Sequence, residues 1–297
     1  MAPKQLHLVR HAHGYHNLCI ENHQLLDPLL TPQGEQQCVT LSKEMKEAAL
    51  SIDCIVASPS RRALYTALLT FGDVLNSQPN LRIIALPELQ ETAALPCDVG
   101  LPLEELLREF EGKPIDFSRL DQDWNNKLSG PFEPLVDLIQ ARAQKARKFL
   151  QSRPENDVAV VTHGALLHFI TEDWAGCLAG CGTGWKNCEL RTYNFDMSSK
   201  DAITNATILE LPEPFRRRSH DLQPLSADEQ LELREVAQRT WAAEGYLVIP
   251  AAILLGSHAG ALPDAALNLD KVATTFTTSP IRHYDERSTA PAVKSLM

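Results

Sequence analysis

The sequence predicts an α/β protein: a three-layer sandwich with a central, mostly parallel sheet flanked by helices, plus a C-terminal helical and irregular appendage. Two observations predict this class. Short runs rich in Val, Ile and Leu recur through the first 212 residues, as is typical of strands covered on both faces. Stretches with helical periodicity separate these runs, and alternation of this kind favours parallel strand pairing.

Six segments have the composition of buried strands. Each is short and apolar, and each is bounded by polar residues or turn formers. They are residues 5–9, 54–57, 82–86, 158–162, 191–195 and 206–211. We expect them to form the sheet.

Three helices between these strands have recognisable starts. Thr31 is a capping residue with Pro32 at the first helical position, Ser58–Pro59 repeats that signal, and Pro134 opens the third helix. Apolar residues then follow at helical spacing, which predicts one buried face for each helix. They are Leu41, Met45 and Ala48; Leu64, Ala67, Leu68, Phe71 and Leu75; and Leu135, Leu138, Ile139, Ala146 and Phe149.

The character of the chain changes near residue 212. Ser226 and Glu229 form a capping-box pattern, and Gly245 is placed to end the helix that follows. The apolar face of that helix comprises Leu233, Val236, Ala237 and Trp241. Beyond residue 262 the chain is rich in Ala, Thr, Ser and Pro without sustained periodicity. We therefore expect one domain over residues 1–212 and an appendage, a docked helix with a partly irregular tail, over residues 213–297.

Composition narrows the class of protein. The formal charge of −10 over 297 residues argues against a general binder of nucleic acid or of anionic membranes. The longest apolar stretch, residues 246–262, is interrupted by proline, histidine and glycine and is too short to span a bilayer. Seven cysteines lack a disulfide framework, and the N-terminus has no signal-peptide core. These features predict a cytoplasmic protein; they make no prediction about its oligomeric state.

Polar side chains follow four of the predicted strands. Ligands of open α/β sheets bind at the carboxyl ends of the strands, so we expect these side chains to meet at one edge. They are Arg10 and His11, the segment from Ser58 to Arg62, Glu88 and Glu91, and His163 and Gly164.

This set of residue types is suited to phosphoryl chemistry. Arginine and histidine supply charge-assisted hydrogen bonds to the oxygens of a phosphoryl group. A neutral histidine can attack phosphorus, and a nearby carboxylic acid can protonate the leaving alkoxide. The cationic pocket takes the place of a metal ion, so we expect no metal or other cofactor.

Several stretches are similar to motifs of the histidine phosphatase (phosphoglycerate mutase-like) superfamily. "RHAHGYHN" at 10–17 resembles its R-H-G-x-x-x-x-N signature, with Ala12 in place of the usual glycine. "LTPQG" at 30–34, "SPSRRALYTA" at 58–67, "LQE" at 89–91 and "VVTHGALL" at 160–167 follow in the family order. "GTGWKNCELRTYNF" at 182–195 resembles the fungal and plant members. The likeness covers roughly residues 4 to 212.

The resemblance implies a role for each matching residue. It makes residues 1–212 a histidine phosphatase catalytic domain. It places Arg62, rather than Arg61, in the phosphate pocket, and we expect Arg61 to face solvent. The implied roles are His11 as nucleophile, Arg10, Arg62 and His163 as phosphate pocket, Glu91 as proton donor, and Asn17 and Gly164 as substrate contacts.

Two alternatives concern the site. Glu88 is close enough in sequence to exchange roles with Glu91. His11, His13 and His16 resemble an H-x-H-x-D-H zinc-hydrolase pattern, although Tyr15 stands where that pattern has aspartate, and Arg10 would repel a cation. His13 and His16 are better interpreted as pocket wall or loop residues.

Three functions are compatible with these residues. The favoured one is a metal-independent phosphatase that hydrolyses a small organic phosphomonoester through a phosphohistidine at His11. A phosphoglycerate mutase is disfavoured because "ENHQLLDPLLTPQG" at 21–34 replaces the F-T-G-W segment of mutases. A non-catalytic phosphate-binding module is disfavoured because the residues expected of a catalyst are all present: a nucleophile (His11), a proton donor (Glu91) and the phosphate-binding arginines (Arg10 and Arg62). Apolar residues in segment 92–130, such as Leu95, Val99 and Leu101, predict a non-sugar substrate.

Overall fold

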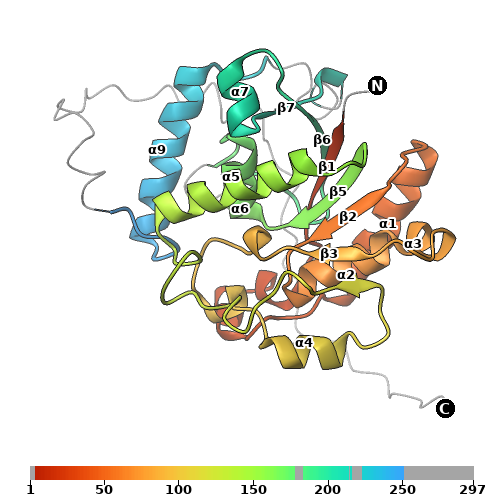
Figure 1. Ribbon diagram of the computed structural model, residues 1–297. Helices are drawn as coiled ribbons and strands as arrows, with labels where there is room; N and C mark the ends of the chain where they lie inside the picture. Colours follow the sequence, from red (N-terminus) through yellow and green to blue (C-terminus); the bar gives the residue numbers. More distant parts are fainter. Residues whose placement is uncertain (1–3, 178–182, 214, 216–222, 251–297) are drawn as a thin grey trace, which may run out of the picture. The chain divides into compact units, whose positions relative to one another are not determined.

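The computed structural model describes residues 4–177, 183–213, 215 and 223–250. Its centre is a seven-stranded sheet with the order β4-β3-β2-β5-β1-β6-β7 (Figure 1). Neighbouring strands from β4 to β1 pair in parallel, whereas β6 is antiparallel to β1 and β7. The strands are β1 (Gln5–Arg10), β2 (Cys54–Ala57), β3 (Ile83–Ala85), β4 (Ile115–Asp116), β5 (Asp157–Thr162), β6 (Leu190–Phe195) and β7 (Ile208–Glu210).

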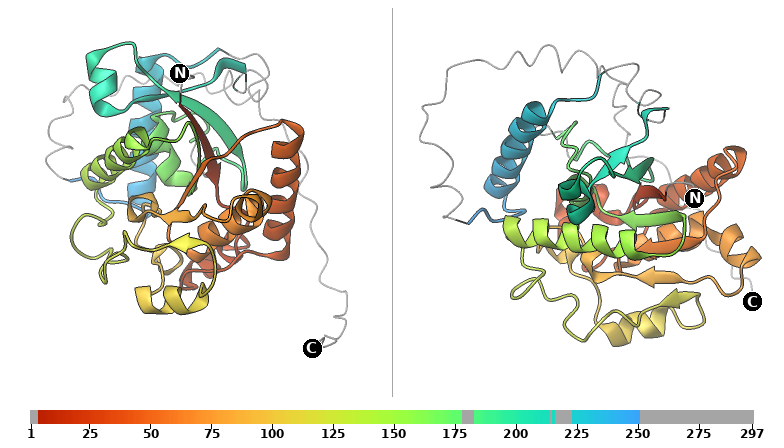
Figure 2. Two further views of the ribbon diagram at one scale, coloured as in Figure 1. Left: turned by 45° about the vertical axis from the view of Figure 1, so that its right-hand side comes forward. Right: turned by 45° about the horizontal axis from the view of Figure 1, so that its top comes forward.

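Helices cover both faces of the sheet, which confirms the predicted three-layer α/β class (Figures 1 and 2). One face carries α1 (Pro32–Glu47), α2 (Arg61–Thr70), α3 (Gly72–Ser77) and α4 (Leu103–Glu109). The other carries α5 (Val136–Ser152), α6 (Gly164–Thr171) and α9 (Ala227–Ala243), with α7 (Lys200–Asn205) against α5. The short 3₁₀ helices are η1 (Tyr15–Asn17), η2 (Ile20–Gln24), η3 (Pro87–Leu89) and η4 (Pro96–Asp98).

Alternation along the central strands explains why they are apolar throughout. In β5, Val158 and Val160 pack with α5 and α6, whereas Ala159 and Val161 pack with α1 and α2. Successive side chains of a strand point to opposite faces, so a strand covered on both sides has no position for a solvated residue. The sheet is thereby a rigid base for the loops at its ends.

The first helix begins where the sequence predicts, and the second does not. Thr31 caps α1 by accepting a hydrogen bond from Gly34 N at 3.1 Å. Helix α2 begins at Arg61 after Ser60, rather than at Ser58–Pro59. The reason is tertiary: the Ser58 hydroxyl lies 2.8 Å from Nε2 of His163 and is unavailable as a cap.

The start of α5 is also later than predicted. Pro134 does not open the helix, which begins at Val136. Instead, Pro134 O accepts from Val248 N at 2.7 Å, and Val136 N donates to Val248 O at 3.0 Å. A contact from more than 100 residues away therefore determines this boundary.

Several short elements were not predicted, among them α4, β4 and α7. Helix α4 and strand β4 lie within the segment that separates β3 from α5, and α7 precedes β7. The last strand is correspondingly shorter than residues 206–211, because Ala206 has a φ of 52° and ends α7 in the left-handed region. These elements are too short for periodicity to reveal.

Helix α9 has the predicted capping box, with Glu229 N donating to Ser226 Oγ at 3.3 Å. Its Trp241 packs against Trp174, with ring centroids 6.0 Å apart, and joins the α5–α6 core. Val236 is 41% exposed, so its predicted place on the buried face is wrong.

The tail predicted beyond residue 262 lies outside the described residues. Of the helices that the structure describes, none combines the length and the apolarity needed to cross a bilayer.

Candidate active site

The carboxyl ends of β1, β2, β3 and β5 bring the predicted residues together. These four strands are parallel neighbours in the sheet, so the segments that follow them share one edge. The ring centroid of His11 lies 5.2 Å from that of His163 and 5.2 Å from that of His16. Nη2 of Arg62 lies 3.0 Å from Nδ1 of His163.

His11 is buried and has one ring nitrogen anchored. Its Nδ1 lies 2.8 Å from the carbonyl oxygen of Ala12, which accepts the ring proton and leaves a lone pair on Nε2. Burial, and then the positive charge of Arg62, holds the pKa of His11 well below its ordinary value. The ring is therefore neutral at physiological pH, as a nitrogen nucleophile must be.

His163 has the opposite tautomer. Its Nδ1 accepts from Arg62, so the proton resides on Nε2, which donates to Ser58 Oγ at 2.8 Å and lies 3.2 Å from Ser60 Oγ. Burial, followed by the charge of Arg62, also places the pKa of His163 well below its usual range. The two serines were not predicted as partners of His163, because "SPS" by itself indicates only a helix start.

Arg62 is 1% exposed and is held by groups from η4. Nη1 donates to the carbonyl of Cys97, and Nη2 donates to Asp98 Oδ1 at 2.8 Å. Among the described residues, Nε of Arg62 is buried without a hydrogen-bond partner. Asp98 was not predicted, although "PCDVG" offered a lone acidic residue in an apolar stretch. Burial raises the pKa of Asp98, and the Arg62 charge opposes that rise.

Arg10 approaches the same pocket from the end of β1. Its Nη1 donates to the Trp185 carbonyl at 2.5 Å, and in the described part of the chain its buried Nε has no partner. Gly164 makes room for it: a Cβ at that position would lie 3.1 Å from Nε of Arg10 and 2.4 Å from Oγ1 of Thr183. Gly164 thus contributes by having no side chain.

The two candidate carboxylates lie in different surroundings. Glu91 accepts from the backbone N–H groups of Ala165 at 3.2 Å and Leu166 at 3.0 Å, in the first turn of the helix that follows His163. Glu88 instead pairs with Lys145 of α5, with Nζ and Oε1 separated by 2.5 Å. Only Glu91 is therefore attached to the segment that carries His163.

Asn17 lies beside the His11 loop. Its Oδ1 accepts from Gly14 N at 3.0 Å and from Nδ2 of Asn187 at 3.3 Å. Asn187 also lies 3.2 Å from the His11 carbonyl, so it ties the two loops together. Asn187 was not singled out in the sequence, although it lies in the stretch that resembles fungal and plant members.

The remaining residues of interest have separate surroundings. Burial, then the charges of Arg62 and Arg10, lowers the pKa of His16 to about 2, so this ring forms a neutral wall of the pocket. His13 Nδ1 lies 3.0 Å from Thr31 Oγ1.

Across the described ranges, no three His, Cys, Asp or Glu side chains are grouped to hold a metal ion. Arg61 is half-buried rather than fully in solvent: its side chain is 22% exposed, and its Nε donates to Glu109 Oε1 at 2.9 Å.

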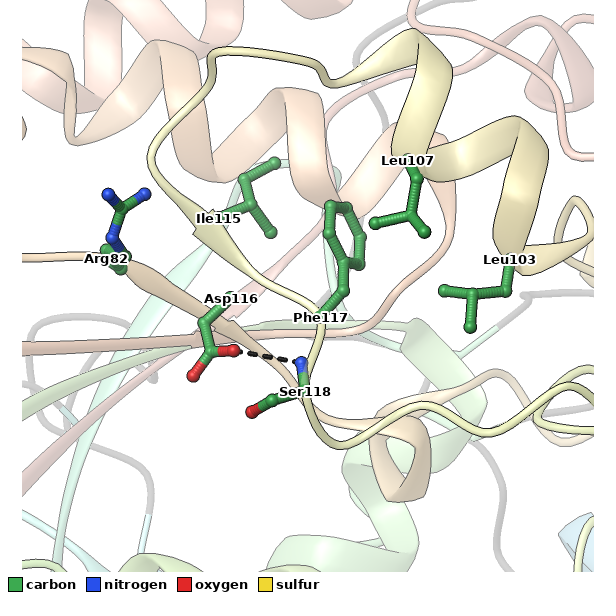
Figure 3. Close-up of a pocket in the computed structure, with 7 residues that line it drawn as sticks. All are labelled: Arg82, Leu103, Leu107, Ile115, Asp116, Phe117 and Ser118. Atoms are coloured by element: carbon green, nitrogen blue, oxygen red, sulfur yellow. Dashed lines mark hydrogen bonds between the residues drawn. The ribbon is translucent and has the colours of Figure 1, made fainter.

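A surface pocket of about 420 Å³ lies away from these residues. Arg82, which precedes β3, lines it together with the apolar side chains of Leu103, Leu107 and Phe117 (Figure 3). The pocket therefore lies at the β4 edge of the sheet, beside α4. It contains none of the predicted site residues.

Two neutral imidazoles beside two guanidiniums, at the carboxyl edge of an α/β sheet, define a protein that handles phosphate esters. A sequence model of the histidine phosphatase superfamily (branch 1) matches residues 6–203. The chain belongs to this superfamily. The predicted family and the phosphatase class of enzyme are thereby confirmed.

Individual relatives are consistent with this membership. The chain is 27% identical over 228 residues to phosphoglycerate mutase-like protein 1 of Arabidopsis thaliana, covering 64% of this chain and 80% of the relative. It is 30% identical over 171 residues to a probable phosphatase of Schizosaccharomyces pombe, covering 54% and 74%. The ecdysone phosphate phosphatase of Bombyx mori, solved with tungstate, has a TM-score of 0.50 at 15% identity, covering 71% of this chain and 93% of that one. This last likeness shows the fold.

Proposed function

We propose that the protein hydrolyses a small organic phosphomonoester through a phosphohistidine formed on His11, without a metal ion. One observation carries the proposal: Nδ1 of His11 is anchored on Ala12 O at 2.8 Å, which leaves the lone pair of Nε2 in a pocket with Arg62 and His163. A neutral, oriented imidazole next to phosphate-binding cations is what nucleophilic attack on phosphorus requires.

The first step transfers the phosphoryl group to the enzyme. Nε2 of His11 forms a bond to phosphorus while the bond from phosphorus to the ester oxygen breaks. Guanidinium groups of Arg10 and Arg62 neutralise the equatorial oxygens, and their Nε atoms, which have no partner among the residues that the structure describes, are available donors. Asn17 contributes a further contact, and Nε2–H of His163 does so when it exchanges Ser58 Oγ for a phosphoryl oxygen. Gly164 keeps the pocket open to Arg10.

Glu91 moves the protons in both steps. As a carboxylic acid it protonates the departing alkoxide, and as a carboxylate it then takes a proton from water. That water attacks phosphorus, the bond to Nε2 breaks, and inorganic phosphate and free His11 result. Attachment of Glu91 to Ala165 N and Leu166 N supports this assignment over Glu88, which is paired with Lys145.

The domain organisation and the setting are part of the same proposal. Residues 1–212 form the catalytic domain, and residues 213–297 are an appendage whose α9 contacts the end of α6 through Gln230 and Trp241. The acidic charge supports a small-molecule substrate rather than a nucleic acid. The six cysteines in the described ranges are all free thiols, which supports a reducing, cytoplasmic location.

Trapping of phosphate label on the protein with an alkaline, denaturing quench tests the proposal. The wild-type protein should carry acid-labile, base-stable label after mixing with a labelled ester, and His11→Ala should carry none and lose hydrolysis. His13→Ala is the matched control, because that ring lies against Thr31. Unchanged turnover in His11→Ala would overturn the proposal. Transfer of label to a second sugar acid without release of phosphate would favour a mutase.

A further inference from the structure

Lys127 is a buried amine that the proposed mechanism does not use. It lies in the irregular segment between β4 and α5, yet its residue is only 3% exposed. Its Nζ donates to the backbone carbonyl of Glu91 at 2.5 Å. Lysine rarely loses its hydration without a specific partner, so this position calls for a functional explanation.

Packing of the neighbouring residues holds Lys127 in place. A Cβ on Gly100 would lie 2.1 Å from the Trp124 ring, which shows how closely the indole covers that glycine. Asn125 Nδ2 donates to Gly100 O at 2.7 Å, and Gln90 Nε2 donates to Trp124 O at 2.6 Å. The segment 124–127 is therefore attached both to the loop after η4 and to the loop that carries Glu91.

The Glu91 carbonyl is bound by two cations. Arg142 of α5 donates to the carbonyls of Gln90 at 2.6 Å and Glu91 at 3.2 Å, and Lys127 donates to the second of these. Hydrogen bonds from charged donors are roughly twice as strong as neutral ones. The backbone at Glu91 is thus held by two cations, while the first turn of α6 holds its carboxylate.

Charges around Lys127 make its protonation sensitive to pH. Asp98 of η4 and Glu91 attract the ammonium, while Arg142 of α5 and Arg62 of α2 repel it, and the neutral ring of His163 lies in the same field. Burial first, and then Arg142, lowers the pKa of Lys127 to about 7. Both forms of the amine are therefore populated near neutral pH.

We propose that Lys127, in its ammonium form, is a positioning residue that holds Glu91 in place for proton transfer and sets the alkaline limit of activity. The proposal rests on the function of Glu91 proposed above. When the ammonium loses its proton, the Glu91 carbonyl keeps only a weaker hydrogen bond from the neutral amine. Proton donation to the leaving group then becomes less efficient, while attack by His11 is retained.

The test compares two substrates over a range of pH. An alkyl phosphate depends on protonation of its leaving group, whereas an aryl phosphate with an acidic phenol does not. Lys127→Met should lower kcat/KM for the alkyl ester by about 10- to 100-fold and for the aryl ester by less than about 3-fold. The wild-type profile for the alkyl ester should have an alkaline limb near pH 7 to 8, which is above the second ionisation of the ester at about pH 6.

Two further variants complete the test. Lys127→Arg retains a charge that does not titrate, so activity should persist and the alkaline limb should move up by at least about 2 pH units. Lys145→Met is the matched control: this exposed lysine pairs with Glu88, and its loss should leave the limb unchanged. An alkaline limb with the same midpoint in Lys127→Met or Lys127→Arg, or equal losses on both esters, would overturn the proposal.

Failure of this proposal is distinguishable from failure of the proposed function. If the wild-type protein forms phosphohistidine and the limb persists in the Lys127 variants, the role of Lys127 is wrong and the mechanism stands. If no label is found on His11, the mechanism itself is wrong. If Lys127→Met does not fold, the comparison of the alkaline limb between Lys127→Arg and the wild-type protein still tests the role of Lys127.

Discussion

Asp98 Oδ1 lies 2.8 Å from Nη2 of Arg62, the same nitrogen that lies 3.0 Å from Nδ1 of His163. One guanidinium nitrogen is thereby shared between a carboxylate and an imidazole. Nη1 donates to the Cys97 carbonyl, so the plane of the guanidinium is fixed, and within the described ranges the buried Nε has no hydrogen-bond partner. Asp98 therefore orients Arg62, the proposed phosphate ligand, and through it favours the tautomer of His163.

Replacement of Asp98 tests this relationship. Asp98→Asn leaves the Arg62 charge buried without its ion pair, and breaking a buried pair costs about 3–5 kcal/mol. We expect a free energy of unfolding lower by about 3 kcal/mol and a kcat/KM at least about 10-fold lower, because Arg62 is no longer held in plane. Urea unfolding and steady-state assays measure both. Asp121→Asn, at an exposed position, is the control, and an unchanged kcat/KM in Asp98→Asn would contradict the orienting role.

Gly164 offers a steric test of the phosphate pocket. In Gly164→Ala the new methyl group would meet Thr183 Oγ1 at 2.4 Å and Arg10 Nε at 3.1 Å, so Arg10 must move. Because Arg10 is a proposed phosphate ligand, KM should rise by about 10-fold, equivalent to one charge-assisted hydrogen bond. Gly72→Ala is the control, since a methyl group at that position would have no atom of another segment within 4 Å. Equal KM values for the two variants would show that Arg10 does not bind the phosphate group of the substrate.

The position of the site was predictable because topology places it. Four apolar runs of parallel strands each end in a polar residue, and the carboxyl ends of such strands meet at one edge. His11, Arg62 and His163 follow from that rule and from the family resemblance.

The partners of these residues were not predictable by the same means. Asp98 and Lys127 come from long irregular segments, whose paths depend on contacts such as Trp124 against Gly100. Ser58 illustrates the same limit: its sequence signal is a helix cap, but its hydroxyl partners His163, so α2 starts later. Tertiary contacts with distant segments outweigh local preference at these positions.

Glu91→Gln tests the proton donor. An amide cannot protonate the leaving oxygen, so hydrolysis of an alkyl phosphate should fall by about 100-fold or more, while an aryl phosphate should lose much less. Glu88→Gln provides the matched control, because Glu88 pairs with Lys145 instead of the first turn of α6. Rates for both esters with each variant settle the assignment. Equal losses of activity on the two esters would show that Glu91 is not the proton donor. A larger loss on the alkyl ester in Glu88→Gln than in Glu91→Gln would show that Glu88 is the proton donor.

A chelator experiment tests metal independence. Turnover of an aryl phosphate should be the same in excess chelator and after dialysis, because the proposed pocket neutralises the phosphoryl oxygens with Arg10 and Arg62. His13→Ala should retain activity, since the zinc alternative requires His13 as a ligand. Loss of activity in chelator, with recovery on adding zinc, would establish the metal-dependent alternative that uses His11, His13 and His16.

Asp27 predicts a pH dependence of stability. The side chain is fully buried, with Oδ1 accepting from Arg61 N at 3.0 Å and Oδ2 accepting from Leu101 N at 3.1 Å. Burial raises its pKa from 3.8 to about 6, against the opposing charge of Arg62. The folded state therefore binds more protons than the unfolded state between about pH 4 and 6, and this group's contribution to the free energy of unfolding falls as pH rises through that window.

The difference between the wild-type protein and Asp27→Asn isolates this contribution from that of the histidines. Asparagine does not titrate, so the stability of the wild-type protein relative to the variant should decline by up to about 3 kcal/mol from pH 4 to 7. Asparagine also loses one of the two backbone bonds, which shifts the difference by a constant without changing its slope. Urea unfolding at pH 4, 5, 6 and 7 provides the measurement. A difference that is constant over this range would show that burial leaves the pKa of Asp27 near 3.8, whereas a difference that increases with pH would show that the backbone donors lower it.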